Sequence, residues 1–247
     1  MLRWAGHLAV VLALTALTQL GGLAWIGAVL MRRRWLFVVF YALLWGAAWV
    51  AAPMAGRVAL PCTGDVLRMQ SPVYCVAMRN FVTPEMALVA QGAAEAVARQ
   101  YPGTVTLALD GGLPFLDGFP LLPHLSHDDG EKLDLAFYYA DEAYAPGRSR
   151  SPIGYFAFEA LDAPVCPPAW LTLRWDLRWL QPLWSASDLQ VEEARTVALI
   201  HALETDARVA KIFVEPPLLQ RWGLAGPKLR FQGCRAARHD DHVHVQL

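Results

Sequence analysis

The sequence predicts an α+β protein with apolar membrane segments at its N-terminus, and three observations lead to this. Hydrophobic residues make up 55% of the chain and the mean hydropathy is +0.30, which is high for a wholly soluble domain. The longest apolar stretches lie before residue 57. Beyond residue 83, helical and strand-like segments alternate irregularly, so we expect one domain around a central, mainly antiparallel sheet. A chain of 247 residues can bury one substantial core besides accessory segments.

The N-terminal region contains two stretches without formal charge, residues 4–31 and 35–56. Each exceeds the roughly 20 residues that a helix needs to cross a bilayer. The loop Arg32-Arg33-Arg34 lies between them, and an excess of arginine places a short loop in the cytoplasm. We therefore expect residues 1–57 to form a two-helix transmembrane hairpin, with everything after it on the other side of the membrane. A signal peptide would need a small-residue cleavage site after a short apolar region, and amphipathic core helices would need a polar face.

The charges are divided unevenly along the chain. Residues 1–57 contain five arginines and no acidic residue, whereas residues 58–247 have a formal charge of −6. Binding to phosphates requires a basic surface. The acidic balance of the larger part therefore argues against a nucleic acid as partner.

Residues 58–82 show little periodicity and are expected to form a junction before a domain over residues 83–247. The chain has four cysteines, Cys62, Cys75, Cys166 and Cys234. If the domain lies outside the cytoplasm, they allow three disulfide pairings, of which we favour Cys62–Cys75 with Cys166–Cys234; free structural thiols are the alternative. No C-x-x-C spacing occurs, so a cysteine zinc site is not expected.

Local patterns predict the elements of the domain. A helix over residues 83–100 is expected to begin at Thr83, with Pro84 and Glu85 in its first turn. The Trp-rich stretch 164–184 is expected to pack over the domain or form one wall of its cleft. We expect strands at 105–109, 133–139, 153–158, 211–214 and 243–246, a helix at 187–207 opened by a capping box of Ser187 and Gln190, and a short helix at 218–222.

The last ten residues contain three of the seven histidines. His242 and His244 are separated by one residue, so on a strand both side chains project from the same face. Neutral imidazole is a good ligand for zinc, and a catalytic zinc takes three protein ligands with a fourth position for water. The tail therefore needs a further ligand from elsewhere in the chain.

A second group of candidate ligands lies more than a hundred residues upstream. His127 and Asp134 are seven positions apart, with Gly130 between them and an apolar, strand-like run following. A glycine turn can bring the histidine back towards the aspartate at the start of a strand. The two segments together predict a metal site.

These two segments resemble the penicillin-insensitive murein endopeptidases, zinc peptidases related to lysostaphin and the D-Ala-D-Ala metallopeptidases. The resemblance covers roughly residues 80–247, with supporting matches at 123–125 and 211–216. The residues that match are Ser126-His127, Gly130 and Leu133-Asp134 in the first segment and His239-Asp240-Asp241-His242-Val243-His244 in the second.

The resemblance implies that His127, Asp134 and His244 bind zinc. It implies that His242 lies beside the zinc-bound water as a catalytic residue, and that His239 contacts the substrate or the transition state. Asp241 occupies the position at which related dipeptidases place a catalytic carboxylate. The base is therefore His242 or Asp241, and we favour His242.

Other polar residues have less specific interpretations. Arg148 and Arg150 could bind a substrate carboxylate, although a solvated loop is the alternative. His124 is expected to hydrogen-bond its loop, and His201 to be structural. Ser126 lacks the surroundings of a nucleophilic serine.

The resemblance implies a zinc endopeptidase that hydrolyses D-alanyl cross-links in peptidoglycan, its peptide substrate. The membrane hairpin, where that family usually has a cleavable signal, would place it in a bacterial inner membrane with its domain facing the periplasm. Two alternatives remain open, a D,D-carboxypeptidase or dipeptidase on the same scaffold and a non-catalytic membrane protein that binds metal or cell wall.

Overall fold

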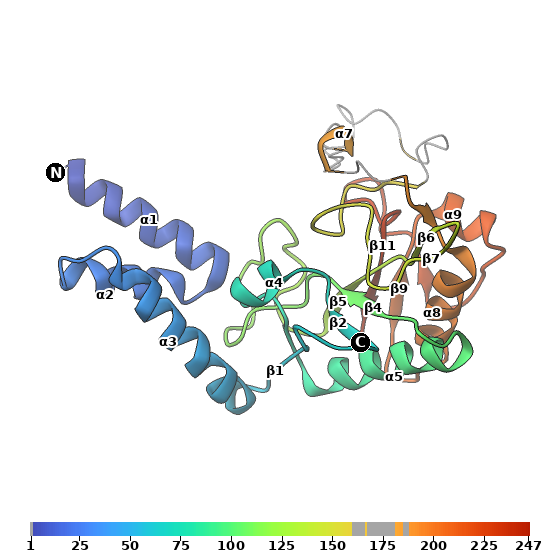
Figure 1. Cartoon of the computed structure of the whole chain (residues 1–247), viewed down its shortest axis with the longest axis horizontal. Coiled ribbons are helices and arrows are strands. Elements are labelled where there is room, and N and C mark those ends of the chain that lie inside the picture. Colours follow the sequence, from blue (N-terminus) through green and yellow to red (C-terminus); the bar gives the residue numbers. More distant parts are fainter. Residues whose placement is uncertain (1, 160–165, 167–180, 185–187) are drawn as a thin grey trace. The chain divides into compact units, whose positions relative to one another are not determined.

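The computed structural model describes residues 2–159, 166, 181–184 and 188–247, and they form a mixed α+β protein, as expected (Figure 1). Most of the Trp-rich stretch, with Trp170, Trp175 and Trp179, and the expected capping residue Ser187 lie outside this part. The chain divides into two compact units. The first comprises Met1–Leu60, Pro72–Ala87 and Asp110–Lys132, and the second comprises Pro61–Ser71, Leu88–Leu109 and Leu133–Leu247.

The first apolar stretch does not form the single long helix that we expected. It breaks at Gln19, which has a φ of 61°, into α1 (Leu2–Thr18) and α2 (Gly21–Leu30). A Cβ at Gly22 would lie 2.0 Å from Thr15 Oγ1, so this glycine allows α2 to pack closely against α1. The left-handed backbone of Gln19, with Gly21 and Gly22 close behind it, reverses the chain, although hydropathy alone suggested one continuous helix.

The second apolar stretch forms α3 (Leu36–Ala51) and a 3₁₀ turn, η1 (Ala52–Ala55). Within the part of the chain that the structure describes, Leu36–Ala55 is the one helix long and apolar enough to cross a membrane, judged by length and composition. It has 20 residues, a mean hydropathy of 1.9, and only 11% of it is buried. The expected pair of membrane-spanning helices is therefore not confirmed.

One face of α3 packs within the first unit. Ala48 and Ala52 form an apolar cluster with Met78 and Phe81. The same unit contains the short helix α4 (Pro72–Val76), and an antiparallel pair of β1 (Val58–Ala59) and β3 (Phe81–Val82).

A six-stranded sheet has the strand order β10-β9-β11-β5-β4-β2. The pairs β10–β9 and β2–β4 are parallel, whereas β11–β9 and β4–β5 are antiparallel. The sheet is thus mixed, whereas we had expected it to be mainly antiparallel. Its strands are β2 (Leu67–Met69), β4 (Thr106–Ala108), β5 (Lys132–Ala136), β9 (Lys211–Phe213), β10 (Leu229–Arg230) and β11 (His242–Gln246).

A smaller sheet accounts for two differences from the expected elements. The expected strand 133–139 is divided between β5 and β6 (Tyr139–Asp141), and β6 pairs with β7 (Ala143–Tyr144) and β8 (Gln190–Val191). Because Gln190 belongs to a strand, α8 (Glu193–Thr205) begins later than expected. Its cap is Glu192, whose side chain accepts a hydrogen bond from Arg195 N at 2.7 Å.

The other helices begin close to their expected positions. Thr83 Oγ1 accepts a hydrogen bond from Met86 N at 3.2 Å and caps α5 (Pro84–Gln100). The short helix α9 spans Pro216–Arg221, two residues earlier than expected, whereas α7 (Gln181–Trp184) is a helix that we had not expected.

The expected strand at 153–158 is absent from the described residues. Gly154 there has a φ of +80°, and a Cβ on it would lie 2.3 Å from Leu109 Cδ2. A turn packed against a core leucine has replaced the extended backbone.

Cys166 and Cys234 form a disulfide, as expected. Cys62 and Cys75 are also disulfide-bonded, so the chain has no free cysteine.

Candidate metal centre

Two neighbouring strands of the large sheet bring Asp134 and His244 into contact. Leu133 and Leu135 of β5 and Val243 and Val245 of β11 are fully buried in the core. Side chains alternate along a strand, so the residues between these core positions project from the other face. On that face His244 Nδ1 lies 2.7 Å from Asp134 Oδ1, and both side chains are about 2% exposed or less.

Asp134 has a second partner that the sequence did not reveal. Tyr155 donates a hydrogen bond from its hydroxyl to Asp134 Oδ2 at 2.7 Å, and its ring packs edge-on against His242 at 5.0 Å. Tyr155 lies in the segment that we expected to be a strand, and no spacing to another polar residue marks it. Its hydrogen bond occupies one carboxylate oxygen while the other faces the histidines.

His242 lies beside Asp134 and is oriented by Asp241. Its Nε2 is 3.7 Å from Asp134 Oδ1, and its Nδ1 is 2.5 Å from Asp241 Oδ1. Asp241 Oδ2 in turn accepts a hydrogen bond from Phe156 N at 2.6 Å. Burial lowers the pKa of His242, but the carboxylates of Asp134 and Asp241 outweigh it and raise that pKa to about 9. Asp241, the alternative candidate for the base, is thus hydrogen-bonded to the imidazole of His242.

His239 packs against both other histidines of the tail. Its ring centroid lies 5.1 Å from that of His242 and 5.3 Å from that of His244, and its backbone N–H donates to Glu215 Oε1 at 3.2 Å. His239 is therefore a buried neighbour of the site, in the region where the resemblance predicts a substrate contact.

In the first unit, the loop before β5 orients His127. The Nδ1 of His127 lies 2.9 Å from Gly111 O. Because a carbonyl oxygen can only accept, Nδ1 carries the proton and Nε2 presents its lone pair. A Cβ at Gly111 would lie 2.8 Å from Val82 Cγ1, so glycine is needed for the backbone of residue 111 to pack this closely against Val82.

His124 hydrogen-bonds in the same loop, as expected. Its Nδ1 lies 2.8 Å from Asp110 Oδ2, and Arg79 Nε donates to Asp110 Oδ1 at 2.5 Å. Burial would raise the pKa of Asp110, yet Arg79 and His124 hold it well below its ordinary range. A permanently charged carboxylate therefore fixes the His124 ring.

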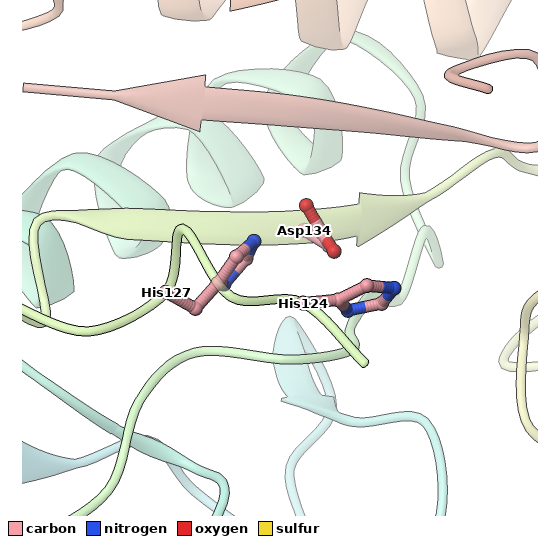
Figure 2. Close-up of side chains that lie close together, drawn as sticks. All are labelled: His124, His127 and Asp134. Carbon is pink, nitrogen blue, oxygen red and sulfur yellow. The ribbon is translucent and has the colours of Figure 1, made fainter. Parts of the chain in front are cut away.

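The side chains of His124, His127 and Asp134 converge, as Figure 2 shows. Each offers one ligand atom, and these atoms lie within 4.8 Å of one another, so the group could hold a metal ion. Imidazole nitrogen and carboxylate oxygen are donors that suit zinc. His124 was not among the expected ligands, although its three-residue spacing from His127 could have suggested it.

His244, the third expected ligand, contacts Asp134, but among the described residues the group whose ligand atoms lie within 4.8 Å of one another is His124, His127 and Asp134. His244 Nδ1 contacts Asp134, and its other nitrogen contacts the side-chain amide of Gln246 at 3.0 Å. Because an amide nitrogen can only donate, His244 Nε2 accepts this hydrogen bond, so Nδ1 carries the proton that faces Asp134 Oδ1.

The two expected substrate arginines have different surroundings. Arg148 is exposed, whereas Arg150 Nη1 donates to Glu159 Oε1 at 2.8 Å and is largely buried. Among the described contacts, Arg150 is held in this internal ion pair. A substrate carboxylate would therefore have to compete with Glu159.

No protein-family model matches the chain, and no significant match was found among curated proteins.

Proposed function

We propose that this protein is a zinc-dependent endopeptidase that hydrolyses D-alanyl peptide cross-links in peptidoglycan. The observation that supports the proposal is the arrangement around Asp134. One oxygen of this carboxylate faces His244 and His242, and His242 is paired with Asp241. A carboxylate that can bind metal beside an Asp–His pair offers a metal ligand and a proton-transfer group, the two parts that metal-assisted amide hydrolysis uses.

The donor set fits zinc because it offers neutral imidazole nitrogens and one carboxylate. His127, Asp134 and His244 would hold the ion, as the resemblance implies, and His124, whose ligand atom lies within 4.8 Å of those of His127 and Asp134, is an additional candidate. Zinc, when bound, would polarise the scissile carbonyl and lower the pKa of a bound water to about 7.

The residues around the metal have complementary roles in this proposal. With zinc bound, the charge of Asp134 that helps to raise the pKa of His242 to about 9 would be offset, and His242 Nε2 would take the proton of the attacking water and deliver it to the leaving amine. Asp241 keeps the proton of His242 on Nδ1, so that Nε2 is the nitrogen that exchanges protons. Tyr155 fixes the Asp134 carboxylate, and the His239 ring, which packs against His242, would contact the substrate or the charged transition state.

The proposed location is a bacterial inner membrane, with the domain in the periplasm. Leu36–Ala55 is long enough to anchor it, and the Arg32-Arg33-Arg34 loop would stay in the cytoplasm. The disulfide-bonded cysteines support a domain in an oxidising compartment.

The test uses the full chain purified in detergent and incubated with muropeptide dimers, with and without a chelator. We expect monomers to be released, and chelation to abolish the release. His127→Ala should remove both bound zinc and activity, whereas His201→Ala, an exposed histidine on α8, should change neither. Intact dimers despite bound zinc would show a metal-binding protein without this activity. Release of free D-alanine alone would show a D,D-carboxypeptidase.

A further inference from the structure

Two pieces of the first unit are attached to the apolar helices. Tyr41 donates from its hydroxyl to Val76 O at 2.6 Å, and Trp45 Nε1 donates to Cys75 O at 2.7 Å, which ties α4 to α3. Phe115 N donates to Gln19 Oε1 at 3.2 Å, and the Phe115 ring packs on the cluster around Ala48 and Ala52. The loop of residues 113–125 is thereby attached to the α1–α2 turn and to α3.

These attachments lie well inside the length of α3. At 1.5 Å per residue, Tyr41 is about 20 Å from the Ala55 end of Leu36–Ala55. The hydrocarbon core of a bilayer is about 30 Å thick, close to the length of the whole helix. If α3 crosses a bilayer, the backbone of Cys75 and Val76 lies at membrane depth beside it.

The surface of α4 and the 113–125 loop suits such a position. Val73, Val76, Leu116 and Leu125 are between 57% and 62% exposed. Residues 72–78 have no ionisable side chain other than Tyr74, which is buried. In the loop, the Asp117 side chain is 72% exposed but is paired with Arg57, and His124 is paired with Asp110.

The hydrogen bonds from α3 also remove a cost of burial in lipid. The carbonyls at the end of a helix have no partner within it, and an unsatisfied carbonyl costs several kcal/mol in hydrocarbon. Tyr41 satisfies the carbonyl of Val76 at the C-terminal end of α4, and Trp45 adds a second donor to the carbonyl of Cys75, which also accepts from Met78 N at 3.1 Å.

We propose that α4 and the 113–125 loop insert into the bilayer beside α3, with their exposed valines and leucines in contact with lipid. The inference rests on the membrane location in the proposed function. We infer that lipid contacts this apolar surface because direct hydrogen bonds hold α4 against the exposed apolar helix α3.

The experiment measures depth by spin labelling of the full chain in phosphatidylcholine–phosphatidylglycerol liposomes. Because no cysteine is free, one introduced cysteine takes the label. The test variants are Val73→Cys and Leu116→Cys. The references are Val38→Cys, on the exposed face of α3, and Glu85→Cys, at the exposed start of α5. The readout is the ratio of accessibility to oxygen over accessibility to a water-soluble nickel chelate.

We expect the ratios at 73 and 116 to exceed that at 85 several-fold and to approach that at 38. A ratio at 73 or 116 equal to that at 85, with a high ratio at 38, would overturn the inference and leave the anchor in place. A low ratio at 38 as well would overturn the membrane location itself, and with it the inference.

Discussion

His242 lies where it can exchange protons without having to bind the metal. Its Nε2 is 3.7 Å from Asp134 Oδ1, and Asp241 holds its Nδ1. We predict that His242→Ala retains bound zinc but lowers kcat by about 10²–10⁴-fold, the usual contribution of a general base. Zinc content by atomic absorption and turnover of muropeptide dimers check the two halves. Unchanged turnover would exclude His242 from the chemistry.

Asp241 gives a matched variant for the same pair. Asp241→Asn keeps the shape but loses the charge that favours a proton on His242 Nδ1. We predict a smaller fall in kcat than in His242→Ala, with zinc content unchanged. If Asp241→Asn were the more damaging of the two, Asp241 would be the base.

Tyr155 is predicted to support metal binding through Asp134. Tyr155→Phe removes the hydroxyl that donates to Asp134 Oδ2, and loss of such a supporting hydrogen bond weakens metal binding by about 10–100-fold. Tyr138→Phe is the control, because its hydroxyl pairs with Thr106 Oγ1 instead. Competition with a fluorescent zinc chelator measures both. Equal affinities in the two variants would contradict the role of Tyr155.

Those parts of the candidate site could be predicted in which the alternation of a single strand, or one local turn, brings the residues together. The alternation of β11 put His242 and His244 on one face, and the positive φ of Gly130 (+73°) agrees with the expected turn before Asp134. Tyr155 could not be found, because it reaches Asp134 from a turn whose path depends on packing against Leu109. The ion pair of Arg150 with Glu159 is equally a product of the fold.

Among the elements, α5 provides a local test of stability. Thr83 Oγ1 accepts from Met86 N at its start. Thr83→Ala is predicted to lower the free energy of unfolding by about 1 kcal/mol, because one amide of the first turn loses its acceptor. Thr83→Ser keeps the hydroxyl and should stay close to the original protein. Urea denaturation followed by circular dichroism compares the three, and equal midpoints would show that this cap has no effect.

The start of a helix was predicted well where neighbouring residues determine it, and poorly where pairing with a strand distant in sequence determines it. Thr83, Pro84 and Glu85 define the start of α5 without any tertiary help. The capping box at Gln190 failed because pairing of this residue with Ala140 makes it part of a sheet, and Glu192 takes over the cap. Likewise, hydropathy cannot show that Gln19 reverses the chain between α1 and α2.

For the whole molecule, a buried carboxyl gives stability a defined pH dependence. Burial raises the pKa of Glu159 from 4.5 to about 7; Arg150 opposes this rise, and Asp241 and Asp240 add to it. Between these two values the folded state binds more protons than the unfolded state, so stability falls as pH rises. The free energy of unfolding has lost its full contribution from Glu159 above pH 7. This contribution is on the order of 3 kcal/mol, since a shift of one pKa unit corresponds to about 1.36 kcal/mol.

Glu159→Gln removes this group and is predicted to flatten the fall in stability between pH 4.5 and 7. A smaller slope of the same sign should remain, because burial also raises the pKa of Asp240, to about 6, against the opposing effect of Arg238. Urea midpoints of the full chain in detergent, measured at half-unit steps of pH, separate the two contributions. If the profile of Glu159→Gln coincided with that of the original protein, Glu159 would titrate alike in both states, and its ion pair with Arg150 would fully offset the cost of burial.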